Sequence, residues 1–264
     1  MKIGFIGCGN MASAIIGGLM KNDVFATEDI YATALTEATR IRAKEQFGIQ
    51  IAESNRALVE TVDIVVLAVK PQYYQTVIEE VGDAVREDQL LISIAPGKTM
   101  EWLREKFGKP VKIIRSMPNT PAMVGKGMTA ICYNQLVDDA DLDITGKIFG
   151  GIGEYEIIGE HLMDAVVGVS GSSPAYIFML IEAMADAAVL GGMPRKQAYK
   201  FAAQAVEGSA AMVRELGRHP GDLKDMVCSP AGTTIEAVAV LEDKGFRSAV
   251  IEAMRVCMDK SGKM

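Results

Sequence analysis

The first half of the chain alternates short apolar runs with longer segments in which apolar residues recur at helical spacing. Continuous apolar runs are typical of parallel strands covered on both faces, and helical spacing between them predicts the connecting helices. This alternation predicts a doubly wound α/β sheet with right-handed crossovers. The predicted strands are Ile3–Ile6, Ile30–Ala34, Ile64–Val69, Leu90–Ile94, Val111–Ile114 and Met128–Cys132, and the clearest predicted helices are Thr36–Phe47, with Gly48 as its stop, and Gln75–Arg86.

After about Glu160 the strand signals stop and only helical patterns remain. Ser173 followed by Pro174 predicts an N-cap and a first helical residue. The helix that they open is apolar on most sides as far as Gly191, so we expect it to be buried on most sides. The later predicted helices are Pro194–Leu216, Thr234–Lys244 and Arg247–Ser261.

The pattern therefore divides the chain into an α/β domain at residues 1–159 and a helical domain at residues 160–264, with no flexible linker between them. A helical domain of about 100 residues is too small to bury a nearly all-apolar helix by itself. We therefore expect the helical domain to dimerise by packing against a second copy.

Directly after the first strand, Gly7, Gly9 and Ala12 have the spacing of a dinucleotide-binding turn. Gly7 permits the tight turn, Gly9 lets a pyrophosphate approach the backbone, and Ala12 lets the helix lie close to the strand. The N–H groups at the helix start would then receive the phosphates. The alternative is an ordinary strand–turn–helix, but the strand before the triplet and the helix after it favour dinucleotide binding.

The second predicted strand ends without the acidic residue that holds the ribose 2′-hydroxyl in an NAD site. Thr33 and Thr36 could instead donate to a 2′-phosphate, and Arg40 could reach it from the next helical turn. These residues favour NADPH as the cofactor. In the alternative, Glu37 turns back toward the ribose and NADH is used.

Three loops follow predicted strands, at residues 68–71, 95–97 and 117–121. They face one crevice, because ligands bind at the carboxyl ends of parallel strands. Lys70 follows a wholly apolar strand, so it either has an anionic partner or is solvated at the sheet edge. Asn55 and Asn119 could hydrogen-bond a ribose or a nicotinamide amide, and each could equally hold a turn.

The segment from His219 to Thr234 contains a loop rich in Ser, Pro, Gly and Thr that leads into a helix. Unpaired N–H groups and hydroxyls at such a place form a receptor of carboxylate size. The alternative is a plain connection in which Thr233 or Thr234 caps the helix. The only other histidine is His161, and neither histidine has a triad or metal-ligand spacing. Histidine acid–base catalysis is therefore disfavoured, and an electrophile that is already protonated, such as an iminium, would need less help.

Composition narrows the class of protein. A chain of 264 residues can hold two domains, and a net charge of −7 with a pI near 5.0 argues against nucleic acid or an anionic membrane as partner. Cys8, Cys132, Cys228 and Cys257 are far apart and match no metal-site spacing, which indicates reduced thiols. No secretory signal is visible, and the apolar stretch Pro174–Leu190 is too short to span a bilayer comfortably. We therefore expect a soluble, cytoplasmic protein.

Several separated blocks, which together cover essentially the whole chain, resemble one enzyme family. They are Gly4-Phe-Ile-Gly-Cys-Gly-Asn-Met-Ala12, Ala68-Val-Lys-Pro71, Arg115-Ser-Met-Pro-Asn-Thr-Pro121 and Gly168-Val-Ser-Gly-Ser-Ser-Pro-Ala-Tyr176. The most specific block runs from Pro220 through Val227-Cys-Ser-Pro-Ala-Gly-Thr-Thr234 to Glu242. On these residues the chain resembles the pyrroline-5-carboxylate reductases, the last enzymes of proline biosynthesis.

The resemblance implies an N-terminal Rossmann-type domain, a C-terminal all-α dimerisation domain, and assembly of homodimers into a higher oligomer such as a decamer. It implies reduction of a cyclic imine with one carboxylate, 1-pyrroline-5-carboxylate, to L-proline by hydride from NADPH or NADH. By the same resemblance, the loop carrying Ser229, Gly232 and Thr233 binds the carboxylate through backbone amides. The Thr234 hydroxyl would hydrogen-bond the ring nitrogen as the catalytic residue, and Glu160 would lie near the substrate.

Together with the residues singled out above, the resemblance gives the expected set of cofactor-binding residues. The set is Gly7, Cys8, Gly9, Asn10, Met11, Ala12, Thr33, Thr36, Asn55, Ala68, Val69, Lys70, Ala95, Gly97, Met117 and Asn119.

Two residues depart from the family pattern. Ala231 stands where many members have glycine, so a positive φ there would be strained, and Pro96 replaces a small residue.

Two other functions are alternatives to the reductase. A β-hydroxyacid dehydrogenase would need a lysine on the helix after a Ser/Gly-rich turn, but the next lysine after Ser173 is Lys196, beyond that helix. A dinucleotide-sensing regulator would bind the cofactor without turnover.

Overall fold

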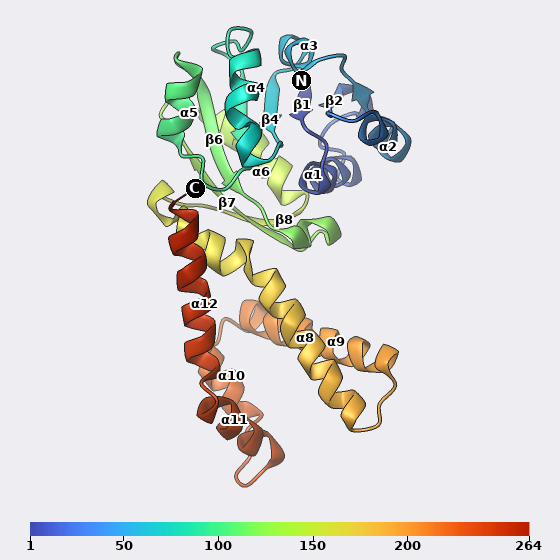
Figure 1. Ribbon diagram of the computed structural model, residues 1–264, viewed down its shortest axis with the longest axis vertical. Coiled ribbons are helices and arrows are strands. Elements are labelled where there is room, and N and C mark those ends of the chain that lie inside the picture. The colour runs from blue at the N-terminus through green and yellow to red at the C-terminus, as the bar shows by residue number, and fades with distance from the viewer. Residues whose placement is uncertain (264) are drawn as a thin grey trace. The chain divides into compact units, whose positions relative to one another are not determined.

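The structure is a computed structural model that describes residues 1–263 (Figure 1). It divides by packing into two compact units, which are described separately. The first unit holds Met1–Ser172 and the end of the chain from Cys257, and the second unit holds Ser173–Val256. This division falls inside a helical segment, a little after the domain boundary predicted between residues 159 and 160, which stays a prediction.

One eight-stranded sheet forms the centre of the first unit (Figure 1). Its strand order is β3-β2-β1-β4-β5-β6-β7-β8, and all neighbours are parallel except β6 and β7. The order reverses between β1 and β4, which confirms the predicted doubly wound sheet. The strands are β1 Ile3–Ile6, β2 Ile30–Thr33, β3 Gln50–Ile51, β4 Ile64–Leu67, β5 Leu90–Ser93, β6 Lys112–Met117, β7 Gly127–Tyr133 and β8 Gly153–Ile157.

Helices cover both faces of the sheet, and each face has its own apolar core. Phe5 and Ile92 belong to the core beneath α1 and α6, whereas Val65 and Leu91 belong to the core beneath α3, α4 and α5. Every residue of β1, β4 and β5 is buried, as their continuous apolar sequences predict. The helices are α1 Asn10–Lys21, α2 Glu37–Phe47, α3 Asn55–Thr61, α4 Tyr74–Val81, α5 Met100–Phe107 and α6 Asp139–Gly150.

The ends of α2 follow the predicted signals. The Thr36 hydroxyl accepts a hydrogen bond from the Thr39 N–H at the start of the helix, and Gly48 ends it in the left-handed conformation, with φ of +68°. An N-cap side chain and a C-terminal glycine of this kind each satisfy backbone groups that the helix leaves unpaired. The prediction of this helix is therefore confirmed to within one residue.

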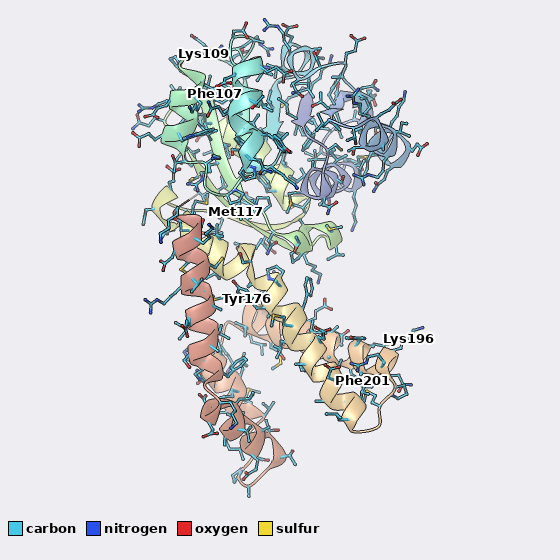
Figure 2. All side chains as sticks on the ribbon, viewed as in Figure 1. Phe107, Lys109, Met117, Tyr176, Lys196 and Phe201 are labelled. Atoms are coloured by element: carbon cyan, nitrogen blue, oxygen red, sulfur yellow. The ribbon has the colours of Figure 1, made fainter. Side chains whose placement is uncertain are left out.

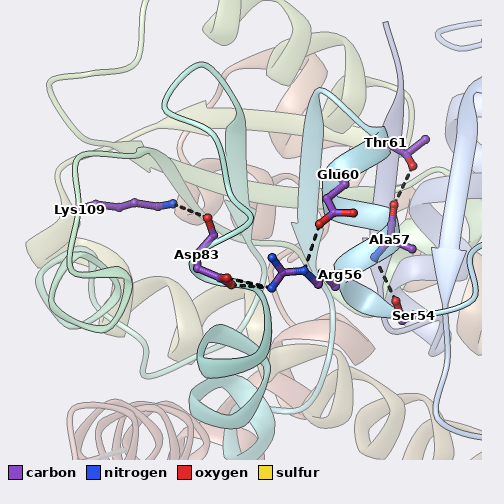
Figure 3. Close-up of polar contacts among 7 residues, drawn as sticks. All are labelled: Ser54, Arg56, Ala57, Glu60, Thr61, Asp83 and Lys109. Carbon is purple, nitrogen blue, oxygen red and sulfur yellow. Dashed lines mark hydrogen bonds and ion pairs between the residues drawn. The ribbon is translucent and has the colours of Figure 1, made fainter.

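A charged network on the surface of the first unit joins α3 to the loop after α4 (Figure 3). Arg56 Nη1 donates to the Asp83 carboxylate at 2.8 Å and Arg56 Nε donates to Glu60 at 3.1 Å, while the Lys109 ammonium reaches the backbone carbonyl of Asp83 at 3.4 Å. Because Arg56, Glu60 and Asp83 are exposed, these ion pairs add little stability.

The second unit is helical. Its helices are α8 Ser173–Leu190, α9 Arg195–Leu216, α10 Pro220–Met226, α11 Thr233–Asp243 and α12 Phe246–Ser261, whose last residues belong to the first unit. The helices α8 and α9 pack together across the small side chains of Ala185, Ala198 and Ala202, which are buried. Large apolar side chains nevertheless stay exposed within this unit, among them Met179 at 69% and Phe201 at 65%. Figure 2 labels Phe201 on α9.

The prediction that a helix starts at Ser173 is confirmed to within one residue, because α8 begins at Ser173. The prediction missed the helical turns directly before it, so that the helical segment runs from Glu160 to Leu190 and includes α7 Met163–Val166 and a π-helical turn at Val167–Gly171. Pro174 has no N–H to offer the carbonyl four residues earlier, which belongs to Ser170. The Asn119 side-chain amide donates to that carbonyl at 2.9 Å instead, so a proline is tolerated in the first turn of α8, directly after the π-helical turn.

The length of this helical segment also corrects the expectation that the apolar stretch Pro174–Leu190 is too short to span a bilayer. Glu160–Leu190 has 31 residues and a mean hydropathy of 1.4, so by length and composition alone it could cross a membrane. Only 6% of its most apolar window is buried within this chain. The apolar surface of this helix therefore has to be covered by something other than the chain itself.

Candidate functional site

A cleft of about 730 Å³ follows the carboxyl ends of β1, β2 and β4 in the first unit. This is the edge at which open α/β sheets bind ligands. The cleft brings together nine of the predicted cofactor residues: Gly7, Cys8, Gly9, Thr33, Thr36, Asn55, Ala68, Val69 and Lys70.

The glycine turn between β1 and α1 has the geometry that a pyrophosphate needs. Gly7 has φ of +95°, and a Cβ there would lie 2.9 Å from the Ala68 carbonyl oxygen. A Cβ on Gly9 would meet no described atom within 4 Å, so the space above this residue is open. Gly9 is also the N-cap of α1, and glycine has no side chain to occupy the first N–H groups of the helix. The turn therefore fits the phosphates of a dinucleotide.

Asn10, Met11 and Ala12 form the first turn of α1 rather than the wall of the cleft. Ala12 is buried in the core beneath the helix, which is the close helix–strand contact expected for it. Asn10 and Met11 contribute backbone N–H groups at the start of the helix. Their predicted role in cofactor binding therefore rests on these N–H groups and not on their side chains.

The loop after β2 forms a second polar corner of the cleft. The Thr36 and Thr39 hydroxyls lie 2.9 Å apart, and Arg40 Nε donates to the Ala34 carbonyl at 2.8 Å, which holds the guanidinium against the loop. Arg42 also lines the cleft, whereas Glu37 is not among the described residues that do. Thr39 and Arg42 were missed by the sequence reasoning. Helical spacing was the available signal. Thr39 lies three positions after Thr36, and residues three positions apart lie on neighbouring parts of one helix face; Arg42 lies three positions further along α2.

Asn55 joins two sides of the cleft. Its Oδ1 accepts a hydrogen bond from the Thr33 hydroxyl at 2.6 Å, and its Nδ2 donates to Glu80 Oε2 at 2.8 Å. Lys70 lies at the rim and is exposed, so it needs no buried partner, in line with the alternative of a solvated lysine. Burial raises the pKa of the Cys8 thiol, which keeps the residue neutral beside the phosphate turn.

The remaining predicted cofactor residues follow β5 and β6. Gly97 has φ of +73° directly after Pro96, which is the residue order of a type II turn, so the family departure at Pro96 suits the local backbone. Met117 ends β6. Asn119 is buried, and besides its bond to Ser170 its Oδ1 accepts from the Met128 N–H at 2.9 Å. The Asn119 side chain therefore holds three backbone segments together.

Glu160, expected near the substrate, is engaged by the protein itself. Its Oε1 accepts hydrogen bonds from Arg115 Nη1 and from the Met100 N–H, both at 2.8 Å. Arg115 is only 5% exposed, and the sequence reasoning did not single it out. The available signal was a charged residue, Arg115, within an apolar strand, because a charge buried there needs a partner of opposite charge.

The loop before α11, in the second unit, is the predicted anion receptor, and this role stays a prediction. Gly232 donates its N–H to the Ser229 carbonyl at 3.0 Å, and a Cβ on Gly232 would overlap the Ser229 side chain. Gly232 is the N-cap of α11, so the alternative in which Thr233 or Thr234 caps the helix is not what the structure shows. Ala231 has φ of +56°, the strained conformation expected for it.

The comparisons with known proteins place these features in a family. Residues 160–264 match the family described as "Pyrroline-5-carboxylate reductase dimerisation", and residues 2–97 match "NADP oxidoreductase coenzyme F420-dependent". A pyrroline-5-carboxylate reductase of Escherichia coli is 56% identical over 263 residues, which cover 100% of this chain and 98% of that protein.

Solved structures agree with these matches over the whole chain. The crystal structure of Plasmodium falciparum pyrroline carboxylate reductase with NADP bound has a TM-score of 0.91 at 31% identity, covering 100% of this chain and 97% of that one. The structure of a pyrroline-5-carboxylate reductase from Coxiella burnetii has a TM-score of 0.91 at 34% identity, covering 99% and 97%.

Proposed function

This chain belongs to the pyrroline-5-carboxylate reductase family, and from that premise we propose how its residues divide the work of the reaction. The reaction is the NAD(P)H-dependent reduction of the C=N bond of 1-pyrroline-5-carboxylate to L-proline, the final step of proline biosynthesis. NADP is the cofactor type, and when bound in its reduced form it supplies the hydride. The family assignment removes the β-hydroxyacid dehydrogenase and the regulator without turnover.

The first unit holds the dinucleotide. The open space above Gly9 and the N–H groups at the start of α1 receive the pyrophosphate. Thr36, Arg40 and Arg42 face the 2′-phosphate, since cations and hydroxyls line that corner and Glu37 is not among the described residues there. The cleft around the glycine turn is the observation that best supports this assignment. The positions after β4, β5 and β6 extend the site toward the nicotinamide end.

The second unit holds the substrate carboxylate. Backbone N–H groups of the loop Ser229–Thr233 bind it at the start of α11, as the resemblance implies. The Gly232 N–H already donates to the Ser229 carbonyl, and glycine as the N-cap leaves the N–H groups that follow it, at the start of α11, to a ligand. The Thr234 hydroxyl hydrogen-bonds the ring nitrogen. Because an iminium is already activated, the protein contributes mainly orientation, which supplies a large share of the rate in such reactions.

The chain forms a homodimer through its C-terminal helical domain. The exposed apolar surface of Glu160–Leu190 is covered in that dimer by the second copy, and this accounts for its hydropathy without a membrane. Assembly of the dimers into a decamer and a cytoplasmic location complete the proposal. The four free thiols, at Cys8, Cys132, Cys228 and Cys257, suit a reducing compartment.

A steady-state assay tests the cofactor assignment. With 1-pyrroline-5-carboxylate as the second substrate, we expect kcat/KM for NADPH to exceed that for NADH by at least about tenfold, or about 1.4 kcal/mol. Arg42→Ala and Thr36→Val should weaken NADPH and leave NADH nearly unchanged, because only NADPH carries the 2′-phosphate. A preference for NADH in the wild-type protein would overturn the 2′-phosphate corner, and no reduction with either cofactor would overturn the function.

A further inference from the structure

One carboxylate of the first unit joins three segments that are far apart in the sequence. Glu160 Oε1 accepts hydrogen bonds from the backbone N–H of Met100 and from Arg115 Nη1, both at 2.8 Å. Met100 is the first residue of α5, directly after the loop at residues 95–99. Arg115 lies on β6 two residues before Met117, where the loop at residues 117–119 begins. Glu160 is therefore bonded to the base of both loops.

The Arg115 end of the pair lies in an apolar environment, whereas the Glu160 side chain is 29% exposed. Arg115 is 5% exposed and sits opposite Cys132 in the sheet register. Cys132 forms a small buried cluster with its neighbours, and Met100 and Met117 pack against that cluster. Burial and, secondarily, the Glu160 carboxylate raise the pKa of Cys132 to about 12, while Arg115 acts in the opposite direction. In such surroundings one charge without the other is costly, so the pair holds a single geometry.

The same loops are bonded to each other near their starts. The Ser116 hydroxyl donates to the Ser93 carbonyl at 3.0 Å, which links the ends of β6 and β5. In a doubly wound sheet the second nucleotide of a dinucleotide lies over the carboxyl ends of the strands beyond the switch point. Here those strands are β4, β5 and β6, so both loops face the nicotinamide end of the proposed site.

We propose that Arg115 and Glu160 are a positioning pair for hydride transfer. The pair locks the loops after β5 and β6 into one arrangement, and this arrangement sets where the nicotinamide ring is held. Glu160 then acts through the two loops and not by direct contact with the imine. The inference rests on the proposed function, because it concerns the reaction assigned to this site.

The test uses the full-length oligomeric protein with Glu160→Gln, Arg115→Met and the double variant. Glu160→Gln keeps an oxygen for the Met100 N–H but leaves the Arg115 charge unpaired. The double variant removes both charges, so it avoids an unpaired buried charge and keeps the test valid if a single variant folds poorly. Lys112→Met is the matched control: Lys112 lies at the other end of β6 and pairs with Asp138 and Asp141, each at 2.8 Å. Arg56→Met is a second control, because it removes the exposed ion pair between Arg56 and Asp83 on the surface of the same unit (Figure 3).

Three measurements separate positioning from substrate contact. They are kcat and KM for the imine and for NADPH, the primary isotope effect with NADPH deuterated at the transferred position, and amide hydrogen exchange over residues 95–103 and 115–120. For Glu160→Gln we expect kcat to fall about tenfold or more, with KM for the imine changed less than about threefold. The isotope effect should rise, because hydride transfer becomes slower than the other steps, and exchange should increase in both loops. The double variant should lose no more activity than the worse single variant.

Two results would overturn the proposal. One is a rise in KM for the imine with kcat and exchange unchanged in Glu160→Gln, which would mean direct substrate contact. The other is a loss of activity in Lys112→Met and Arg56→Met as large as in the pair variants, which would mean general destabilisation. If the wild-type protein fails to reduce the imine, the proposed function falls, and the exchange measurement still decides whether the pair holds the loops.

Discussion

The Thr33 hydroxyl donates a 2.6 Å hydrogen bond to Oδ1 of Asn55, and this bond joins the end of β2 to the first turn of α3. The amide group of Asn55 then reaches Glu80 on α4 at 2.8 Å. Three elements thereby form one wall of the cofactor cleft. The neutral amide of Asn55 satisfies both partners at once, because its oxygen accepts from Thr33 and its nitrogen donates to Glu80.

Asn55→Asp is expected to weaken NADPH binding more than Asn55→Ala does. The aspartate can still accept from Thr33, but it places a second carboxylate beside Glu80 and near the phosphates, whereas alanine only removes two hydrogen bonds. We expect a loss in affinity of about tenfold for Asn55→Asp, partly recovered at high salt because the site is accessible to solvent. Fluorescence titration with NADPH measures it. Equal affinity of the two variants would show that the wall is not held by this amide.

Thr234→Ala is expected to lower kcat by about tenfold to a hundredfold, with the dissociation constant of NADPH nearly unchanged, because in the proposed mechanism the hydroxyl binds the imine and not the dinucleotide. Thr234→Ser keeps the hydroxyl and should recover most of the activity. Single-turnover kinetics give the rate, and NADPH titration serves as the control. Unchanged turnover in Thr234→Ala would remove this residue from the mechanism.

Ala231→Gly is expected to raise stability or leave it unchanged. Ala231 has φ of +56°, which costs an L-residue about 1 kcal/mol relative to glycine, and the greater freedom of glycine in the unfolded chain offsets part of the gain. Ala239→Gly is the control, since Ala239 lies inside α11 and should lose about 1 kcal/mol there. Thermal unfolding at one protein concentration compares them. Equal destabilisation by the two substitutions would contradict the strain at residue 231.

Stability should fall in alkaline solution through Cys132. Burial raises the folded pKa of this thiol from 9.0 to about 12, so its contribution is fully present below pH 9 and is lost as the pH rises toward 12. Between these limits the slope is about −1.4 kcal/mol per pH unit for this one group. Cys132→Ala should unfold with a pH dependence that is shallower by nearly that amount between pH 10 and 11, and by less near pH 9, when urea denaturation is followed at pH 9, 10 and 11. A slope identical to that of the wild-type protein would mean that the thiol is not buried.

Strands with a continuous apolar pattern could be predicted to within three residues, as Ile3–Ile6 and Leu90–Ser93 illustrate, and the polar helix Glu37–Phe47 was predicted from the signals at its ends. The predicted helix Gln75–Arg86 ends earlier than expected, since α4 stops at Val81. The short strands β3 and β8 were missed. β3 has two residues, and β8, Gly153–Ile157, is an edge strand whose glutamates and exposed side chains have no apolar pattern. The seven-residue α10 was missed as well, since His219 caps it through Nδ1 and charged residues fill it. Local sequence carries little information about elements that depend on their neighbours for stability.

The loop before α11 shows both what local sequence can predict and what it cannot. Its Ser, Pro, Gly and Thr residues predict an anion receptor, but only the structure decides that Gly232 takes the N-cap and leaves the threonine hydroxyls out of that role. The segment before α8 shows another limit of local sequence. Ser173 and Pro174 correctly predict the start of α8, but they do not indicate the helical turns before it, where Asn119 satisfies the Ser170 carbonyl that Pro174 leaves unpaired.

The sequence by itself determined the alternation of strands and helices that defines the doubly wound sheet, the phosphate turn, and the need of the helical domain for a second copy, because these depend on neighbouring residues and on the balance of apolar surface. Only the tertiary structure decided that Arg115 and Glu160 form a pair, that Asn55 stands between Thr33 and Glu80, and that Asn119 serves the backbone. The partners in each case are 22 to 51 positions apart. Which polar groups meet after burial depends on the packing of the whole sheet, and no local pattern records it.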